Sequence, residues 1–315
     1  MKYPTLGSLA AIAAIWAAAP LAHAQSDAAG APAGAPADAA VLPATPVPNA
    51  PHVLPAEKSW RFGVGLGLGQ RTNPLIQSED IPVVVDLDIA WFGERWFFDN
   101  FDLGYALVDN ARFTTNVVAR LNSDRAFFGK TNTRYVNFSL AAGGAQVPIT
   151  QPPSTPSPGV DFNQQAELKV PDRDYAVELG LEMLLDGEWG EATLRAFHDV
   201  SGTHEGYEIS ADYSYRWIRG RFSFAPSVGV AYKSAALSDY YWGVHADEVL
   251  PTLQGYQVDG GVGWEAGLRA SYYVTKSMRL ALSANYERLQ YSVAQSPIVA
   301  EPDVIGYFAG LAWQF

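Results

Sequence analysis

The chain has 315 residues, a formal net charge of −12 at pH 7 and no cysteine. The negative charge argues against a nucleic-acid partner, because the phosphates would be repelled. The lack of cysteine excludes disulfides, thiolate metal sites and a cysteine-borne lipid anchor. The 16 Tyr, 9 Trp, 15 Phe and 28 Gly, with only 3 Met, favour strands and tight turns over helices.

The N-terminus has the features of an export signal. Lys2 supplies a positive charge, residues 9–19 form an apolar run, and residues 22–24 read Ala-His-Ala, a small-x-small cleavage site. We therefore predict a signal peptide over residues 1–24. The apolar run is shorter than the roughly 20 residues that a membrane-spanning helix needs. No later stretch is both long and continuously apolar, so transmembrane helices are not expected.

Residues 25–59 are dominated by Ala, Pro and Gly and lack hydrophobic periodicity. Such a segment cannot bury a core, so it is predicted to be a disordered periplasmic tail. A flexible coil of this length spans roughly 30 Å. That reach suits a tether to a partner, and a plain spacer is the alternative.

From Trp60 onward, apolar and polar residues alternate in segments separated by turn residues. Between residues 207 and 217, Tyr, Ile, Ala and Trp side chains occupy one face, and Glu, Ser, Asp and Arg side chains occupy the other. Residues 175–183 and 264–272 repeat this division. The pattern predicts an all-β fold, a closed antiparallel transmembrane β-barrel over residues 60–315. A soluble all-β protein of the periplasm would show similar alternation.

The end of the chain favours the barrel. Tyr307, Leu311, Trp313 and the last residue, Phe315, share one face of a closing strand. A final strand that ends in Phe resembles the recognition signal of bacterial outer-membrane barrels. Together with the export signal, it predicts localisation in the outer membrane, in contact with its lipid and lipopolysaccharide.

The lengths of the connections predict the topology. Short connections fall at residues 92–94, 186–188, 218–220 and 275–276. Long connections fall at residues 72–80, 122–172, 201–206, 234–254 and 295–303. In such barrels short turns face the periplasm and long loops face outside. Parity then requires two short strands within residues 95–108, joined by a tight turn at Asp99-Asn100, which gives about 12 strands.

One set of charged residues is predicted to face the lumen. The set comprises Asp86, Asp88, Glu178, Glu182, Arg195, Asp212, Arg216, Glu265, Arg269, Arg279 and Glu287. Asp86 and Asp88 share a strand face, and paired carboxylates can act as acid and base in glycoside cleavage. The mixed signs of the whole set instead favour cross-strand pairing or a role in permeation. No catalytic, cofactor-binding or metal-binding residue is predicted. Residues 63, 65, 67 and 69 are glycines on the lumen face of the first strand, where they leave room for large neighbours or solvent.

A hydrolase is the catalytic alternative. His198, Ser201 and His204 cluster near Asp199 and Glu205, which invites a Ser-His-acid interpretation. However, residues i and i+3 of a strand point to opposite sides, so His198 and Ser201 are poorly spaced for this chemistry. The histidines are also too scattered to indicate a metal site.

The sequence resembles the MipA/OmpV family from Trp60 to Phe315. The matching stretches are residues 60–67, Asn73-Pro74 leading into 81–83, 199–202 before Gly206, 237–244, 255–257 and 296–299. The resemblance implies an outer-membrane protein without catalytic residues or cofactors. Its best-known member holds a lytic transglycosylase and a bifunctional penicillin-binding protein in one murein-synthesising complex. The tail before Trp60 and the proline-rich 122–172 insertion depart from the family pattern.

Three functions are therefore open. The leading hypothesis is a non-enzymatic scaffold for a lytic transglycosylase and a penicillin-binding protein, which rests on the resemblance. The alternative is a narrow passive pore for small polar solutes, suggested by the polar, glycine-lined lumen. Hydrolysis of outer-membrane lipid through His198 and Ser201 is the third.

Overall fold

The computed structural model of the chain describes residues 59–110, 112–128, 134–138, 146–149, 170–248 and 253–315. The predicted signal peptide, nearly all of the predicted tail and much of the 122–172 insertion lie outside these residues, so those assignments stay predictions. Within the described ranges, no helix has the length and apolar composition to cross a bilayer.

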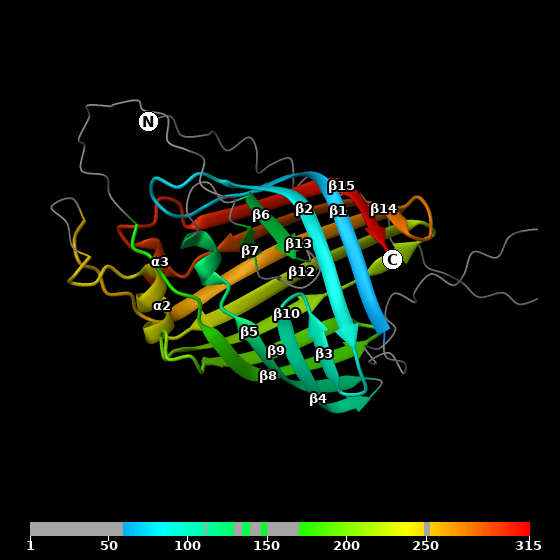
Figure 1. The fold of residues 1–315 in the computed structure, drawn as a ribbon, viewed down its shortest axis with the longest axis horizontal. Helices are drawn as coiled ribbons and strands as arrows, with labels where there is room; N and C mark the ends of the chain where they lie inside the picture. Colours follow the sequence, from blue (N-terminus) through cyan, green and yellow to red (C-terminus); the bar gives the residue numbers. More distant parts are fainter. Residues whose placement is uncertain (1–58, 111, 129–133, 139–145, 150–169, 249–252) are drawn as a thin grey trace, which may run out of the picture. The chain divides into compact units, whose positions relative to one another are not determined.

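Strands make up most of the described chain (Figure 1). They are β1 (Ser59–Arg71), β2 (Ile81–Phe92), β3 (Trp96–Asp99), β4 (Asp102–Asn110), β5 (Phe113–Leu121), β6 (Arg134–Phe138), β7 (Gln146–Ile149), β8 (Val177–Gly187), β9 (Gly190–Asp199), β10 (Tyr207–Ser214), β11 (Trp217–Arg219), β12 (Phe222–Lys233), β13 (Gly261–Tyr273), β14 (Met278–Arg288) and β15 (Asp303–Gln314). The described helices are η2 (Asp124–Phe128), α2 (Ala235–Trp242) and α3 (Tyr291–Ala294).

The sheet closes on itself. Its order runs β1-β15-β14-β13-β12-β10-β9-β8-β5-β4-β3-β2, each pair antiparallel, and β1 also pairs with β2. The predicted closed antiparallel barrel of 12 strands is thereby confirmed. The predicted strand over residues 207–217 is interrupted at residues 215–216, and β11 continues it along β12.

The tight turn that strand parity required is present, one residue later than the predicted Asp99-Asn100. Asn100 and Phe101 join β3 to β4 with φ of 49° and 80°, in the left-handed region that Asn tolerates better than most residues. The Asn100 side chain then extends the pairing with β2. The side-chain Oδ1 accepts from the backbone N–H of Ile89 at 2.9 Å, and the backbone N–H of Asn100 donates to the Ile89 carbonyl at 2.9 Å.

One feature of the wall was not predicted. Because β3 is four residues long, it pairs only with residues 90–92 of β2. The rest of that edge is taken by β6, which runs parallel to β2 from Val83↔Tyr135 to Leu87↔Phe138 and forms a hairpin with β7. Backbone groups in a bilayer must be paired within the protein, so part of the 122–172 insertion satisfies the edge of β2.

Alternation separates an apolar outer face from the lumen. Leu68 on the outside of β1 is 77% exposed, whereas Gly67 beside it lies against Phe308, which is 2% exposed. Inside the barrel, Phe97, Val118 and Phe197 form a small apolar cluster that fills the β3–β9 side. Gly104 and Gly180 lack side chains where the Phe97 and Phe197 rings lie. The open part of the lumen is thus left on the β10–β15 side.

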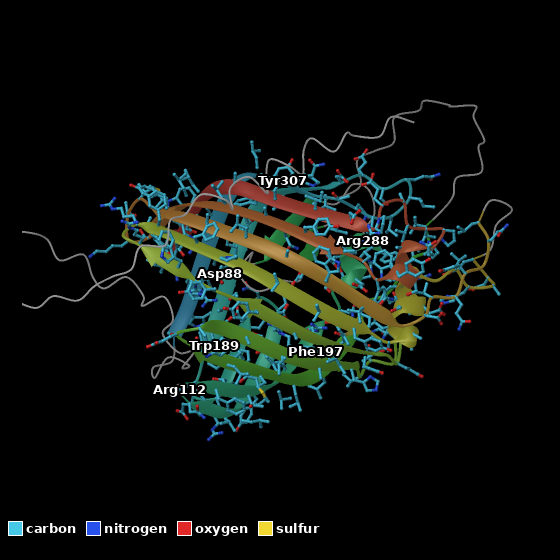
Figure 2. All side chains as sticks on the ribbon, turned by 180° about the vertical axis from the view of Figure 1, so that it is seen from behind. Asp88, Arg112, Trp189, Phe197, Arg288 and Tyr307 are labelled. Atoms are coloured by element: carbon cyan, nitrogen blue, oxygen red, sulfur yellow. The ribbon has the colours of Figure 1, made fainter. Side chains whose placement is uncertain are left out.

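The long connections fold over one end of the barrel. We call η2, α2, α3 and residues 72–80, 243–248, 253–260 and 295–302 the loop cap. Figure 1 shows α2 and α3 at the same end, and Figure 2 places Arg112 and Trp189 at the opposite, short-turn end. The loop cap contains most of the largest apolar core of the described chain. That core comprises Leu75, Ile81, Phe127, Phe128, Leu237, Tyr241, Trp242, Val244, Leu253, Val258, Leu289, Val293, Ile298 and Val304.

Candidate functional site in the barrel lumen

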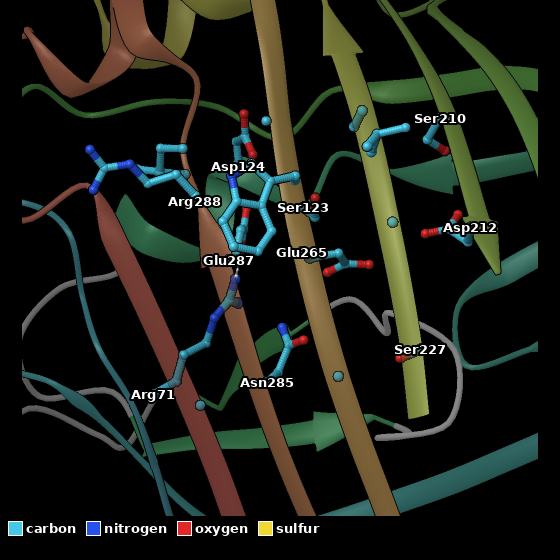
Figure 3. Close-up of a pocket in the computed structure, with 18 of the residues that line it drawn as sticks. Arg71, Ser123, Asp124, Ser210, Asp212, Ser227, Glu265, Asn285, Glu287 and Arg288 are labelled. Carbon is cyan, nitrogen blue, oxygen red and sulfur yellow. Dashed lines mark hydrogen bonds and ion pairs between the residues drawn. The ribbon is translucent and has the colours of Figure 1, made fainter. Parts of the chain in front are cut away.

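A cavity of about 370 Å³ lies in the lumen beneath the loop cap. Residues of β10 and β12–β15 line it, together with η2, Trp242 and the upper part of β1. Figure 3 shows Arg71, Asp212, Glu265 and Glu287 around this space. The lining therefore carries charges of both signs.

The largest charge network lies next to the loop cap. Arg120 of β5 donates to Glu178 of β8 at 2.8 Å and to Glu208 of β10 at 2.9 Å. Its guanidinium also lies 3.8 Å from the centre of the Phe197 ring. Glu178 is fully buried and accepts a second bond from Asn122 at 2.6 Å. A buried carboxylate requires such partners, so the network fixes three strands to one another.

A second network lies at mid-height. Glu182 and Arg195 are cross-strand partners of β8 and β9, and Arg195 donates to Glu182 at 2.9 Å and to Asp212 of β10 at 2.6 Å. Asn116 of β5 donates to the other oxygen of Glu182 at 3.1 Å. These contacts join four successive strands of the wall.

The remaining predicted acidic residues lie beside β1 and around the cavity. Asp88 accepts from Arg61 of β1 at 3.2 Å, and the Asp86 side chain stands beside Gly65. Glu287 accepts from Arg71 at 3.2 Å, and Glu265 is its register partner on β13.

Three arginines of the predicted set lie toward the short turns. Arg269 of β13 lines the cavity. Arg279 of β14 is in register with Ala312, on the face that carries Phe308. Arg216 lies in the break between β10 and β11, one residue before Trp217, which is in register with Phe224 of β12, and its charge acts on that of Arg269. The structure thus places these three cations together, apart from the upper networks.

The loop cap is fastened by a buried guanidinium that the sequence did not single out. Arg173 is 4% exposed and forms two ion-pair contacts with Glu248, one of them at 3.1 Å. It also donates to the carbonyls of Tyr241, at 3.3 Å, and Gly243, at 2.9 Å. Burial acts to raise the pKa of Glu248, but the hydrogen bonds from Arg173 and the backbone of His245 outweigh it and lower that pKa. Burial, aided by the charge of Asp124, raises the pKa of Tyr241.

Asp124 connects the loop cap to the barrel wall. Its Oδ1 accepts from Lys233 of β12 at 2.5 Å, and its Oδ2 accepts from the indole N–H of Trp242 at 3.2 Å. Asp124 belongs to η2, which follows β5, whereas Trp242 ends α2, which follows β12. Segments more than 100 residues apart in sequence are therefore held together over the lumen.

The residues suggested for hydrolysis are arranged differently from a catalytic triad. Ser201 Oγ donates to Asp199 at 2.6 Å, whereas His198 Nδ1 is 2.8 Å from the Gly206 carbonyl oxygen. Asp199 also accepts from the backbone N–H groups of Ser201, His204 and Glu205 at 2.7–2.9 Å. Its carboxylate thus organises the loop between β9 and β10. No group of three potential metal-ligating side chains occurs within the described part of the chain.

A closed antiparallel barrel with an apolar outer face and a polar lumen is the architecture of an outer-membrane protein. Residues 63–315 match the family model described as "MltA-interacting protein MipA", and the chain belongs to this family. The chain is 25% identical over 191 residues to outer membrane protein Omp26La of Vibrio anguillarum, and the match covers 60% of this chain and 69% of that relative. The protein is located in the outer membrane.

Other relatives match a smaller part of the chain. Outer membrane protein OmpV of Vibrio cholerae is 26% identical over 175 residues, which cover 55% of this chain and 63% of OmpV. The MltA-interacting protein of Escherichia coli is 26% identical over 129 residues, which cover 41% of this chain and 52% of that protein.

Several of the stretches that carry the family resemblance fold into the loop cap or organise its neighbouring loop. Residues 237–244 supply the buried side chains of α2, and residues 199–202 form the turn around Asp199. Asn73 caps the Leu75 N–H at 3.1 Å and donates to the Phe127 carbonyl at 3.2 Å. These residues have structural reasons to be present.

Proposed function

We propose that the protein is a non-enzymatic scaffold of the outer membrane that holds a lytic transglycosylase and a penicillin-binding protein at its periplasmic face. The observation that carries the proposal is membership of a family described by interaction with MltA. A relative that shares about a quarter of its aligned residues is named MltA-interacting protein. The barrel itself would be embedded through its apolar face in outer-membrane lipid and lipopolysaccharide.

The loop cap favours a scaffold function rather than that of a pore. Its apolar core and the Lys233–Asp124–Trp242 connection lie across one end of the lumen. A conducting path there would require these buried groups to separate. The lumen charges are proposed to be structural, since cross-strand pairs such as Glu182–Arg195 hold the wall strands in register.

The proposal predicts that partners bind at the short-turn end, which faces the periplasm in such barrels. A photocrosslinking amino acid at Glu188, exposed in the β8–β9 turn, tests it in cells. The matched control position is Tyr291, which is 80% exposed at the loop-cap end. We expect a lytic transglycosylase or a penicillin-binding protein to be crosslinked from position 188 and not from 291. Recovery of neither enzyme from position 188, or equal recovery from both positions, would contradict the proposal.

The second candidate is a narrow passive pore for small polar solutes. One observation favours it: the cavity of about 370 Å³ is lined by charged and hydroxyl side chains, including Asp212, Glu265 and Ser227. A pore requires a path through the loop cap, and conductance in planar bilayers separates the two functions.

A further inference from the structure

Arg216, Arg269 and Arg279 form a group of cations on the lumen face near the short turns. Arg269 lines the cavity and is in register with Ala225 of β12 and Ser283 of β14. Arg279 lies four residues before Ser283 along β14, nearer to the short turn, and is in register with Ala312. Arg216 precedes Trp217, which is in register with Phe224, the neighbour of Ala225, and the charges of Arg216 and Arg279 both act on Arg269. The three side chains therefore come from adjacent parts of the same arc of the wall. We call them the arginine group.

The wall around the arginine group is covered by small side chains. Ala225, Ser283 and Ala312 face its members across the strand pairs, and Gly267 precedes Arg269 by one lumen-facing position. The cavity reaches this part of the wall, since Gly267, Arg269 and Ser283 line it. The Ser283 hydroxyl is buried and has no hydrogen-bond partner among the described residues. The arc thus borders the cavity and carries a buried hydroxyl that has no partner among the described residues.

The charge balance here differs from that of the upper lumen. Arg120 and Arg195 each bind two carboxylates at 2.6–2.9 Å. Arg216 and Arg279, by contrast, form no ion pair with the described residues. The charges of both repel that of Arg269, which Glu191 and Glu265 attract. The charges of Arg216 and Arg279, which no carboxylate of the described residues pairs with, favour the entry of an anion from solution beside Arg269.

We propose that Arg216, Arg269 and Arg279 form a binding site for an oxyanion, a phosphate or carboxylate group, that enters the lumen from the short-turn end. A guanidinium matches both groups because its N–H fork can donate two parallel hydrogen bonds to one oxyanion. Membrane lipid is excluded as the source, since the three side chains lie on the lumen face.

The site does not depend on the scaffold function. Isothermal titration calorimetry of the full chain, refolded in a zwitterionic detergent, tests it with two probes: inorganic pyrophosphate and a triglutamate peptide. The lumen double variant is Arg216→Ala with Arg279→Ala. The matched control, Arg219→Ala with Lys276→Ala, removes the same charge from the turns outside the lumen. A third protein, Arg216→Lys with Arg279→Lys, keeps the charge and loses the fork.

We expect at least one probe to bind the wild-type chain, and the probe that binds identifies the source as phosphate or carboxylate. The lumen double variant should bind it at least roughly tenfold more weakly, the lysine variant should fall between, and the control should stay within about twofold of wild type. Failure of both probes to bind overturns the site. Equal weakening in the lumen variant and the control also overturns it, because the attraction would then be that of any surface cation. If the alanine variant does not refold, the lysine variant decides. Binding by the lysine variant as tight as that of wild type would overturn the site, because the proposal requires paired donation from the guanidinium groups.

Discussion

The loop cap should open when Trp242 is replaced by alanine. Trp242 is 1% exposed, its ring centre lies 5.7 Å from that of Phe127 and 5.5 Å from that of Phe128, and its indole N–H donates to Asp124. Removing a buried Trp side chain costs about 3–5 kcal/mol, and the lost donor to a buried carboxylate adds to this. The wall strands keep their backbone pairing, so the cost falls on the loop cap and not on the barrel.

Hydrogen exchange of the backbone amides of α2, followed by mass spectrometry, measures this opening. If exchange there proceeds through opening of the loop cap, about 3–5 kcal/mol corresponds to exchange roughly 10²- to 10⁴-fold faster. Trp242→Phe, which keeps a ring and loses the N–H, should give a smaller change. Tyr291→Ala at the exposed end of α3 is the control. The reasoning is refuted if Trp242→Ala and Tyr291→Ala exchange alike in α2 while both barrels remain folded.

Three further predictions concern the wall, the pH response and the absence of hydrolysis. Gly67→Ala should impair folding in vesicles, because the added Cβ would stand 2.7 Å from Gly310 Cα. The control Gly306→Ala, whose Cβ would have no atom nearer than 3.8 Å, should fold as wild type does. Similar folding yields of the two variants would contradict this. Since the folded pKa of Glu248 lies below its ordinary value of 4.5, its stabilisation of the loop cap is complete above that value and is lost as pH falls through the folded pKa. Exchange in α2, corrected for intrinsic pH dependence, should therefore rise on acidification, and Glu248→Gln should remove that contribution; an unchanged pH profile would refute the role of this ion pair. Neither the wild-type chain nor Ser201→Ala should cleave phospholipid or lipopolysaccharide. Lipid cleavage by the wild-type chain that is lost in Ser201→Ala would instead support the hydrolase.

The barrel could be predicted because its two signals are local. Alternation along each strand follows from the difference between lipid and lumen, and the lengths of the connections fix strand parity. These signals predicted even a tight turn at Asp99-Asn100, which the structure places one residue later, at Asn100-Phe101.

The loop cap could not be predicted in the same way. Its buried residues lie in connections without period 2, and α2 is only eight residues long. Tyr241 and Trp242 were therefore recognised as part of the family resemblance, but their burial in an apolar core was not predicted. Their burial depends on contacts with η2, more than 100 residues away in sequence.

The sequence predicted a set of lumen-facing charges but not their partners. Partner choice depends on register and strand tilt, as the reach of Arg120 from β5 to Glu208 on β10 illustrates. Arg120 itself was missed, although its position two residues after Val118, on the same strand face, was a usable signal. Arg173 carried no such signal, because it precedes the first regular strand after the insertion.

Single-channel recording in planar bilayers tests the central claim that the loop cap closes the lumen, which distinguishes the proposed scaffold from a passive pore. The wild-type chain should insert without stable conductance steps, and Trp242→Ala should produce them because the loop cap opens. Stable steps from the wild-type chain, unchanged in Trp242→Ala, would contradict the account and establish the passive pore.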